Sequence, residues 1–403
     1  RKQRAEHDAT GATRDLADML SSDEEIEHDT LDSRRKQERY ITKLIKQVHA
    51  SDAELVHIQH EFCFFGKTRR YADRRLLRLM RNIRKPIVLS LHTWKNSMCK
   101  KGMKLSLKSA LSSLYYKIQN RHMRRCLFAA DAIVVHSKDT YAKIIKTYPR
   151  LRKRVYLLPI PVEPVASDGV TAPYQKRPGE KWLVLPGFVS RYKGHRYIID
   201  AMPGLPAEFR LVIAGGVHPK DRLGHEYWSE LLARIDEVSC QDRVVFTGFL
   251  DDSAEQAAVL KQADVFVLPY DEVGQSGSAV LADVLSCGRP IVTSLARSMF
   301  VYRHGNDAVY SSSAVDVEDV EKIRQAVVDA ADPANSPRRQ LHQRNVQKKF
   351  CLERMATQYK LMYESVLASK SKRSTQCAND SMEAKSSSSM MKHQSHFNCL
   401  NAC

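Results

Sequence analysis

The sequence predicts an α/β protein whose chain is organised as two similar halves, each built around a parallel sheet. Short apolar runs that are typical of buried strands alternate with longer segments in which apolar residues recur at helical spacing. Residues 159–180 interrupt this alternation, because they are rich in Pro and Gly and carry no apolar period. With 403 residues, the chain is long enough for two domains with cores of ordinary size.

The first half is expected to begin with a helix at Arg35–Ala50, in which the apolar residues form one stripe. The elements predicted after it are a strand at Leu55–Gln59, a basic helix at Thr68–Arg84, a strand at Pro86–Leu91, an amphipathic helical region to about Phe128 and a strand at Ala132–His136. Helices between successive strands are typical of a parallel sheet. We therefore assign residues 34–158 to an amino-terminal domain and residues 159–180 to a linker.

The second half, residues 181–349, shows the same alternation of strands and helices. Its predicted strands are Trp182–Pro186, Arg210–Ala214, Val244–Thr247, Val265–Leu268 and Ile291–Thr293. Helical segments are expected near Val317–Ala331 and at 350–367, where the second closes the fold. Residues 1–33, which are acidic and lack periodicity, and the Ser- and Lys-rich residues 368–403 are predicted to be disordered.

Charge and cysteine content indicate which partners and which cellular compartment are expected for the protein. The net charge is +18, and the stretch Lys67–Arg125 holds eighteen Lys or Arg against the single acid Asp73. Such a basic segment attracts an anionic membrane surface or another polyanion, or is simply a solvated face. We expect no nucleic-acid partner, because no RNA-binding motif with interleaved aromatic residues is present. Nine scattered cysteines without a C-x-x-C pair, and the absence of a secretory signal or a membrane-spanning run, predict a cytoplasmic protein. A peripheral location at the inner face of a membrane stays open.

Two short motifs resemble known sites and are rejected. Gly66-Lys67-Thr68 looks like the end of a phosphate-binding P-loop, but Glu61 stands where that motif requires its first glycine. His57 and His60 resemble a zinc-binding pair, but an odd spacing on a strand directs them to opposite faces. The sequence therefore predicts no metal site.

Candidate site residues of the second half follow predicted strands at their carboxyl ends, where α/β proteins bind ligands. Gly187 is followed by Arg191 and Lys193 at the start of a helix, and two cations beside a helix N-terminus suit a diphosphate. Gly215 and Gly216 end the next strand and permit close approach of a ligand to the backbone.

The most informative segment is a strand, loop and helix in which two polar residues are eight positions apart. Gln275 lies at the mouth of the helix and Asp283 lies two turns inside it, with Ser276, Gly277 and Ser278 leading into the helix.

In the first half, polar residues also follow strands; these are His92 at one strand end and Gln59, His60 and Glu61 at another. His92 could donate to a substrate hydroxyl or phosphate, although a single histidine at a strand end is more often structural.

These segments together resemble a known family. The segments PGFVSRYKGHRYIIDAM, RLVIAGG, VVFTGFLDD and ADVFVLPYDEVGQSGSAVLADVLSCGRPIVTS look like the donor domain of retaining glycosyltransferases, most of all family 4 with the GT-B fold. In the first half, AELVHIQHEFCFFG, KPIVLSLHTW and ADAIVVHSKDTYAKI resemble the acceptor half of that family. The resemblance covers about residues 50–367 and implies two Rossmann-like domains that face each other across a cleft.

The resemblance implies transfer of a sugar, with retention of its anomeric configuration, from a nucleotide diphosphate donor such as a UDP- or GDP-sugar. It implies no metal and no other cofactor, and it leaves the acceptor open as a glycan, a lipid or a small molecule. By position, Arg191 and Lys193 would hold the diphosphate, and the loop that begins at Gln275 would contact the donor sugar and phosphates. Asp283 would hold the ribose hydroxyls, and His92 would face the transferred sugar from the other domain.

Two features depart from the family pattern. The usual pair of glutamates is replaced by Gln275 and Asp283, which puts donor choice and rate in question. The family's first strand and its glycine-rich loop are not recognisable before residue 34, so we expect an incomplete amino-terminal domain if the chain is complete. Two alternatives stay open: a nucleotide-sugar epimerase, and a non-catalytic GT-B protein that binds an anionic membrane or polyanion through Lys67–Arg125.

Overall fold

The computed structural model describes residues 31–61, 65, 69–94, 120–164, 170–218, 221–250, 253–272, 275–302 and 312–371. The segments predicted to be disordered therefore lie almost wholly outside the described residues, as does most of the helical region before Phe128. The chain divides into two compact units. The first contains Arg1–Ser90, Lys104–Ile133 and Gln358–Cys403, and the second contains Leu91–Met103 and Val134–Thr357.

The first sheet has four strands in the order β1-β2-β3-β4. They span Val56–His60, Ile87–Leu91, Ala132–Val135 and Val155–Leu157, and the short β4 was not predicted from the sequence. Every residue of β2 and β3 is buried, including Ser90, the one polar residue among otherwise apolar runs. The helices in this part of the chain are α2 (Leu31–Ala50), α4 (Arg69–Asn82), α6 (Arg121–Ala129) and α7 (Lys138–Thr147), and a 3-10 turn η1 (Pro149–Arg154) precedes β4.

The second sheet has six strands in the order β10-β9-β8-β5-β6-β7, and all its neighbouring strands pair in parallel. The strands are β5 (Lys181–Pro186), β6 (Phe209–Ala214), β7 (Val244–Phe246), β8 (Val265–Leu268), β9 (Ile291–Ser294) and β10 (Ser312–Val315). Successive strands run outward from β5 to β7, and the chain then returns to the other side of β5 with β8. The order therefore reverses between β5 and β8, and ligands of open α/β sheets bind at such a reversal.

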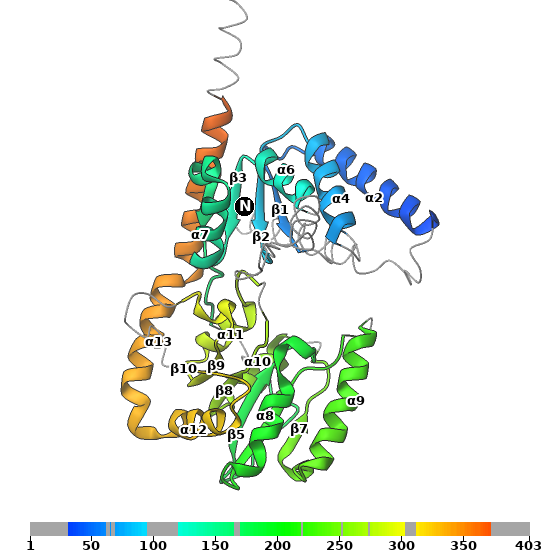
Figure 1. Ribbon diagram of the computed structural model, residues 1–403. Coiled ribbons are helices and arrows are strands. Elements are labelled where there is room, and N and C mark those ends of the chain that lie inside the picture. Colours follow the sequence, from blue (N-terminus) through cyan, green and yellow to red (C-terminus); the bar gives the residue numbers. More distant parts are fainter. Residues whose placement is uncertain are drawn as a thin grey trace, which may run out of the picture. The chain divides into compact units, whose positions relative to one another are not determined.

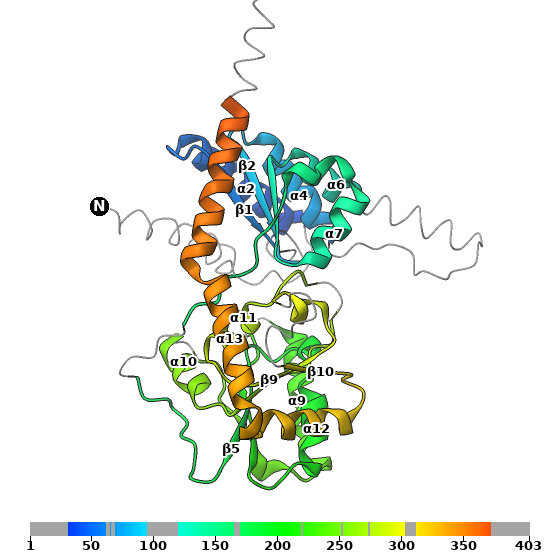
Figure 2. The same ribbon diagram turned by 90° about the vertical axis from the view of Figure 1, so that its left-hand side faces the viewer.

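Helices cover both faces of the second sheet, because its strands bury side chains alternately on either side. On one face Leu183 and Leu185 pack with side chains of α8 (His195–Ala201), α9 (Arg222–Glu237) and α12 (Val320–Ala331). Figure 1 labels these three helices. On the other face Val184 packs with side chains of α10 (Ser253–Lys261), α11 (Ala279–Ser286) and α13 (Ser336–Phe350). Figure 2 shows these three helices in the turned view. Short 3-10 turns complete this part of the chain: η2 (Arg191–Lys193), η3 (Met202–Gly204), η4 (Gln241–Arg243), η5 (Arg297–Phe300) and η6 (Pro333–Asn335).

Polar side chains set the starts of several helices. Asp221, Ser278 and Asp319 cap α9, α11 and α12 by accepting a hydrogen bond from a backbone N–H in the first turn.

The structure adds β10 and α13, which the sequence pattern did not predict, and a helix over 352–371 that extends beyond the predicted 350–367. The predicted strand Val265–Leu268 is confirmed in full as β8. Among the described helices, none combines the length and the apolarity that crossing a bilayer requires.

Candidate active site

The loops that follow β5 and β8 flank the reversal of strand order and are tied to each other. The N–H of Asp271 donates to the carbonyl of Tyr192 at 2.8 Å, and the Tyr197 hydroxyl donates to the Asp271 carboxylate at 3.0 Å. At Gly194 the backbone adopts φ +73°, and a Cβ there would lie 1.9 Å from the carbonyl oxygen of Pro269. This close approach brings the start of α8 directly against the end of β8.

Lys193 is the cation at the centre of this region. Its side chain is 4% exposed, its Nζ donates to the carbonyl of Pro186 at 3.2 Å, and Nζ lies 5.7 Å from the centre of the Tyr270 ring. Burial lowers the pKa of Lys193 to about 8, against which the Asp283 carboxylate acts. Burial and the charge of Lys193 also lower the pKa of the neighbouring His195 to about 3, so this imidazole stays neutral.

Three glycines pack closely where β5 and β6 end, and one of them, Gly187, lies beside the Lys193 ammonium. A Cβ on Gly187, which has φ +95°, would lie 2.1 Å from Nζ of Lys193. A Cβ on Gly215, which has φ +155°, would lie 2.4 Å from the carbonyl oxygen of Gly187, and one on Gly216 would lie 2.8 Å from the N of Phe249. Glycine is therefore needed at Gly215 and Gly216 for close backbone packing and at Gly187 for its positive φ, and of the three Gly187 lies next to Lys193.

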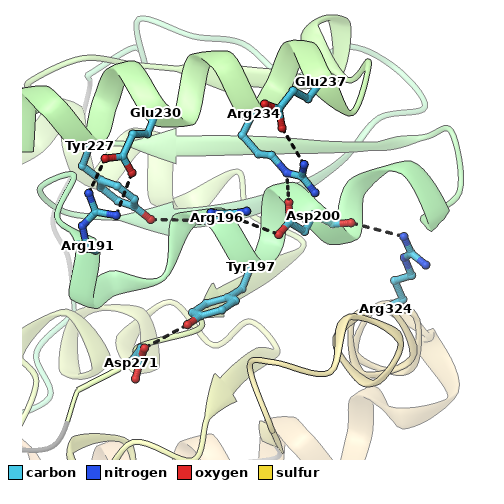
Figure 3. A network of polar contacts seen from close by, with 10 residues as sticks. All are labelled: Arg191, Arg196, Tyr197, Asp200, Tyr227, Glu230, Arg234, Glu237, Asp271 and Arg324. Carbon is cyan, nitrogen blue, oxygen red and sulfur yellow. Dashed lines mark hydrogen bonds and ion pairs between the residues drawn. The ribbon is translucent and has the colours of Figure 1, made fainter.

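Arg191 lies in the same turn as Lys193 but is directed toward helix α9, as Figure 3 shows. Its guanidinium donates to both carboxylate oxygens of Glu230, at 2.8 and 2.6 Å, and lies 4.7 Å from the centre of the Tyr227 ring. The side chain is 65% exposed, and ion pairs between exposed groups contribute little to stability. The two residues that were predicted to bind a diphosphate therefore lie in different environments: Lys193 is buried, and Arg191 is held at the surface by Glu230.

The same network fixes α8 against its neighbours (Figure 3). Arg234 on α9 donates to Asp200 on α8 at 2.6 Å, and Arg324 on α12 donates to the carbonyl of Ala201 at 3.0 Å. The Tyr227 hydroxyl accepts from the N–H of Arg196 at 3.3 Å. These bonds hold the helix that begins directly after Lys193, so they fix the backbone from which the lysine extends.

The loop Gln275–Ser278 is held at several points of its main chain. The N–H of Gln275 donates to the Glu272 carboxylate at 2.7 Å, and the N–H of Ser276 donates to the carbonyl of His92 at 2.7 Å. The hydroxyl of Ser276, a fully buried residue, accepts from the N–H of His136 at 3.1 Å. Gln275 also forms an antiparallel bridge with Thr93.

Gly277 and Ser278 complete this loop. A Cβ on Gly277 would lie 3.0 Å from Cβ of His136, so a larger residue would push the loop away from that histidine. The Ser278 hydroxyl accepts from the N–H of Leu281 at 3.2 Å and so caps α11. The loop therefore reaches the helix in one defined conformation.

Asp283 lies in the middle of α11, on its exposed side. Although the residue is exposed, the protein atoms around its carboxylate raise its pKa to about 6; the charge of Glu163 acts in the same direction and Lys193 acts against it. The charges of Asp283 and Lys193 therefore act on each other's pKa.

His92 is accompanied by a second histidine that sequence reasoning missed. The rings of His92 and His136 lie with their centres 4.8 Å apart, and Nδ1 of His136 lies 2.8 Å from the carbonyl oxygen of Leu158. A carbonyl oxygen can only accept, so the proton of His136 is on Nδ1. The segment that holds His92 belongs to the second unit together with the Gln275–Ser278 loop.

The remaining candidates, Gln59, His60 and Glu61, belong to the first unit. Gln59 lies 3.5 Å from the His57 ring, and His60 is buried and stacks on Phe65 with ring centres 5.8 Å apart. Glu61 is half-buried. Within the described residues, no three His, Cys, Asp or Glu side chains are arranged to hold a metal ion.

Three further residues form an aromatic cluster beside the glycines. The rings of Phe188 and Phe249 are stacked with their centres 5.6 Å apart, and His218 meets Phe188 edge-on at 5.3 Å. Phe188 is 40% exposed and Phe249 is 52% exposed, which is unusual for phenylalanine. Both follow a glycine at a strand end, a signal that could have drawn attention to them in the sequence.

Comparisons with known proteins agree with this architecture. A family model described as Glycosyltransferase Family 4 matches residues 5–165, and one described as Glycosyl transferases group 1 matches residues 180–332. A D-inositol 3-phosphate glycosyltransferase from Xylanimonas cellulosilytica is 26% identical over 175 residues, which is 41% of this chain and 40% of that protein. The matched region therefore spans about two fifths of the length of this curated relative.

Two solved structures share the fold at low sequence identity. HepE from Anabaena, solved in complex with UDP and glucose, superposes with a TM-score of 0.60 at 13% identity, covering 81% of each chain. Sucrose-phosphate synthase from Thermosynechococcus elongatus superposes with a TM-score of 0.63 at 19% identity, covering 83% of this chain and 79% of that one. The two family models together cover most of the chain, so the chain belongs to the glycosyltransferases that they describe, Glycosyltransferase Family 4 in the first half and Glycosyl transferases group 1 in the second.

Proposed function

We propose that the protein transfers a sugar from a nucleotide diphosphate donor to an acceptor, with retention of configuration and without a metal. The observation that carries this proposal is the buried ammonium of Lys193, which lies next to Gly187, close to the reversal of strand order between β5 and β8. A buried cation is costly unless an anion pairs with it, and a leaving diphosphate is such an anion.

In this proposal each element of the site has one task. Lys193 stabilises the negative charge that grows on the leaving diphosphate. The loop Gln275–Ser278 holds the donor sugar, and Asp283 accepts bonds from the ribose hydroxyls. UDP is the favoured nucleoside diphosphate because HepE, which shares the fold, was solved with UDP and glucose. Its base would stack on the exposed rings of Phe188 and Phe249.

The experiment that tests the proposal is a thermal-shift screen with UDP-, GDP- and ADP-sugars. A donor that binds only the folded protein raises its melting temperature, and we expect at least one to stabilise the wild type but not the Lys193→Ala variant. If every nucleotide sugar leaves both proteins unchanged, a non-catalytic GT-B protein becomes the better interpretation. An epimerase would instead convert the donor without any acceptor.

Donor affinity is predicted to be greatest between about pH 6 and pH 8. Below about pH 6 Asp283 is protonated and accepts poorly from a diol, and above about pH 8 Lys193 loses the charge that attracts the diphosphate. The measurement is the dissociation constant of a nucleotide sugar, whose diphosphate diester does not titrate in this range, from pH 5 to pH 9.5. Affinity that stays constant up to pH 9.5 would contradict the role of Lys193.

We further propose that the acceptor is presented at an anionic membrane surface. On α4 the side chains of Arg74, Arg78 and Arg81 are exposed, and on α6 those of Arg124 and Arg125 are exposed as well. Arg78 is partly neutralised by Glu38, so Arg74 and Arg81 are the better test.

Reversal of charge at these two positions should weaken binding to vesicles. We expect the wild type to sediment with phosphatidylserine-containing vesicles at low salt, and Arg74→Glu/Arg81→Glu to remain largely in solution. Vesicles of phosphatidylcholine alone serve as the control. Equal sedimentation of both proteins on anionic vesicles would remove the membrane from the proposal and leave the sugar transfer untouched.

A further inference from the structure

We propose that Glu272 is a positioning residue of the donor-sugar loop, which acts by fixing the main chain of Gln275 and does not lend its charge to the reaction. The inference rests on the proposed function, because it names a residue that the loop needs in order to hold the donor sugar. Glu272 lies just before the loop, and its position three residues from Gln275 gave no signal in the sequence.

Both carboxylate oxygens of Glu272 are engaged within the protein. One accepts from the N–H of Gln275 at 2.7 Å, and the other accepts from the hydroxyl of Ser298 at 2.8 Å. Ser298 is fully buried in η5, the turn that follows β9. Hydrogen bonds to a charged group are about twice as strong as those between neutral groups. The carboxylate therefore ties the loop to the rigid end of the sheet.

The fixed main chain determines where the side chain of Gln275 starts. The N–H of Gln275 is bonded to Glu272, and the next N–H along the chain, that of Ser276, is bonded to the carbonyl of His92. Two successive N–H groups with assigned partners leave the Cα of Gln275 little freedom. Without Glu272, the first of them loses its partner and the entrance to the loop is released, while the Ser276 bond remains.

An alternative is that Glu272 acts through its negative charge. It would then supply the charge that is missing at position 275, where the family pattern described above has glutamate and this chain has Gln275. Positioning is favoured because the carboxylate already accepts from two donors of its own chain. A neutral amide could keep both contacts: its oxygen can accept from the Gln275 N–H, and its NH₂ can donate to the Ser298 hydroxyl. The two explanations therefore differ in what Glu272→Gln does.

The experiment compares Glu272→Ala and Glu272→Gln with wild type, using the donor found in the thermal-shift screen. We expect Glu272→Ala to lower kcat by about 10²-fold, the cost of a misplaced reacting group. The dissociation constant of the free nucleoside diphosphate, which carries no sugar, should stay within about twofold, since in the proposed site Lys193 and Asp283 carry its binding and Gln275 contributes little to it. Glu272→Gln should keep kcat within about fivefold, equivalent to one neutral hydrogen bond.

Ser298→Ala is the matched control, because it removes one of the two contacts and leaves the carboxylate in place. Its kcat should fall between those of wild type and Glu272→Ala. If Glu272→Gln loses as much activity as Glu272→Ala, the charge matters and the inference is overturned. It is also overturned if Glu272→Ala is fully active, or if it weakens nucleoside diphosphate binding as much as turnover. Failure of the wild type to release nucleoside diphosphate from any donor would instead refute the proposed function itself.

Discussion

Replacing Lys193 with methionine is expected to lower kcat/KM for the donor by about 10²–10³-fold, the effect of removing one group that stabilises transition-state charge. Methionine keeps much of the length and volume of lysine but cannot pair with a diphosphate. Because Lys193 is buried and burial lowers its pKa to about 8, loss of the charge should not destabilise the fold. The measurement is steady-state release of nucleoside diphosphate, together with a thermal melt of each variant.

Two further variants make this result specific. Lys322→Met removes a lysine from the exposed surface of α12, where it pairs with Asp319 at 2.9 Å, and should leave kcat/KM unchanged. Arg191→Met tests the second predicted cation, and its effect should stay below about fivefold because the guanidinium is engaged by Glu230. A Lys193→Met protein that is folded and fully active would show that the diphosphate does not bind beside this lysine.

Replacing Gly194 with alanine is expected to destabilise the second unit by about 3–5 kcal/mol. A left-handed backbone costs a residue with a side chain about 1–2 kcal/mol. At Gly194, which has φ +73°, the new Cβ would also lie 1.9 Å from the carbonyl oxygen of Pro269, so the backbone itself must move. Denaturant unfolding measures the loss.

Gly179→Ala is the matched control for this prediction. Gly179 has φ +82°, close to that of Gly194, but a Cβ there would meet nothing within 4 Å. It should therefore cost only the conformational strain, about 1–2 kcal/mol. If the two alanine variants unfold at the same denaturant concentration, the contact between the start of α8 and the end of β8 is not tight, and the proposed donor site loses its rigid base.

Much of the second sheet could be predicted from sequence because its central strands are buried on both faces. The run Val265–Leu268 has no polar residue to obscure its limits, and the structure gives β8 the same limits. The edge strand β10 has the sequence SSAV, and α13 carries few apolar residues among many charges, so neither has a pattern that predicts it. Their formation depends on tertiary contacts instead.

The candidate site was predictable only where it consists of neighbouring residues. Glycine after a strand and a cation at a helix start pointed to Gly187 and Lys193, and the structure brings these two together. The pairing of Arg191 with Glu230 joins residues 39 positions apart, and no local pattern contains it. The same is true of the contact between Gly277 and His136, which depends on how distant parts of the chain pack.

The most direct test of this account is a donor-turnover assay in which nucleoside diphosphate release and the sugar product are measured together. The wild type is incubated at about pH 7 with each of several UDP-, GDP- and ADP-sugars together with candidate glycan, lipid and small-molecule acceptors, and the anomeric configuration of the glycoside that forms is assigned by NMR. We predict that at least one donor yields nucleoside diphosphate and a sugar product of unchanged anomeric configuration, and that Lys193→Met reduces both by about 10²–10³-fold. Inverted product would contradict retention, and release that is equal in wild type and Lys193→Met would contradict the assignment of the donor site.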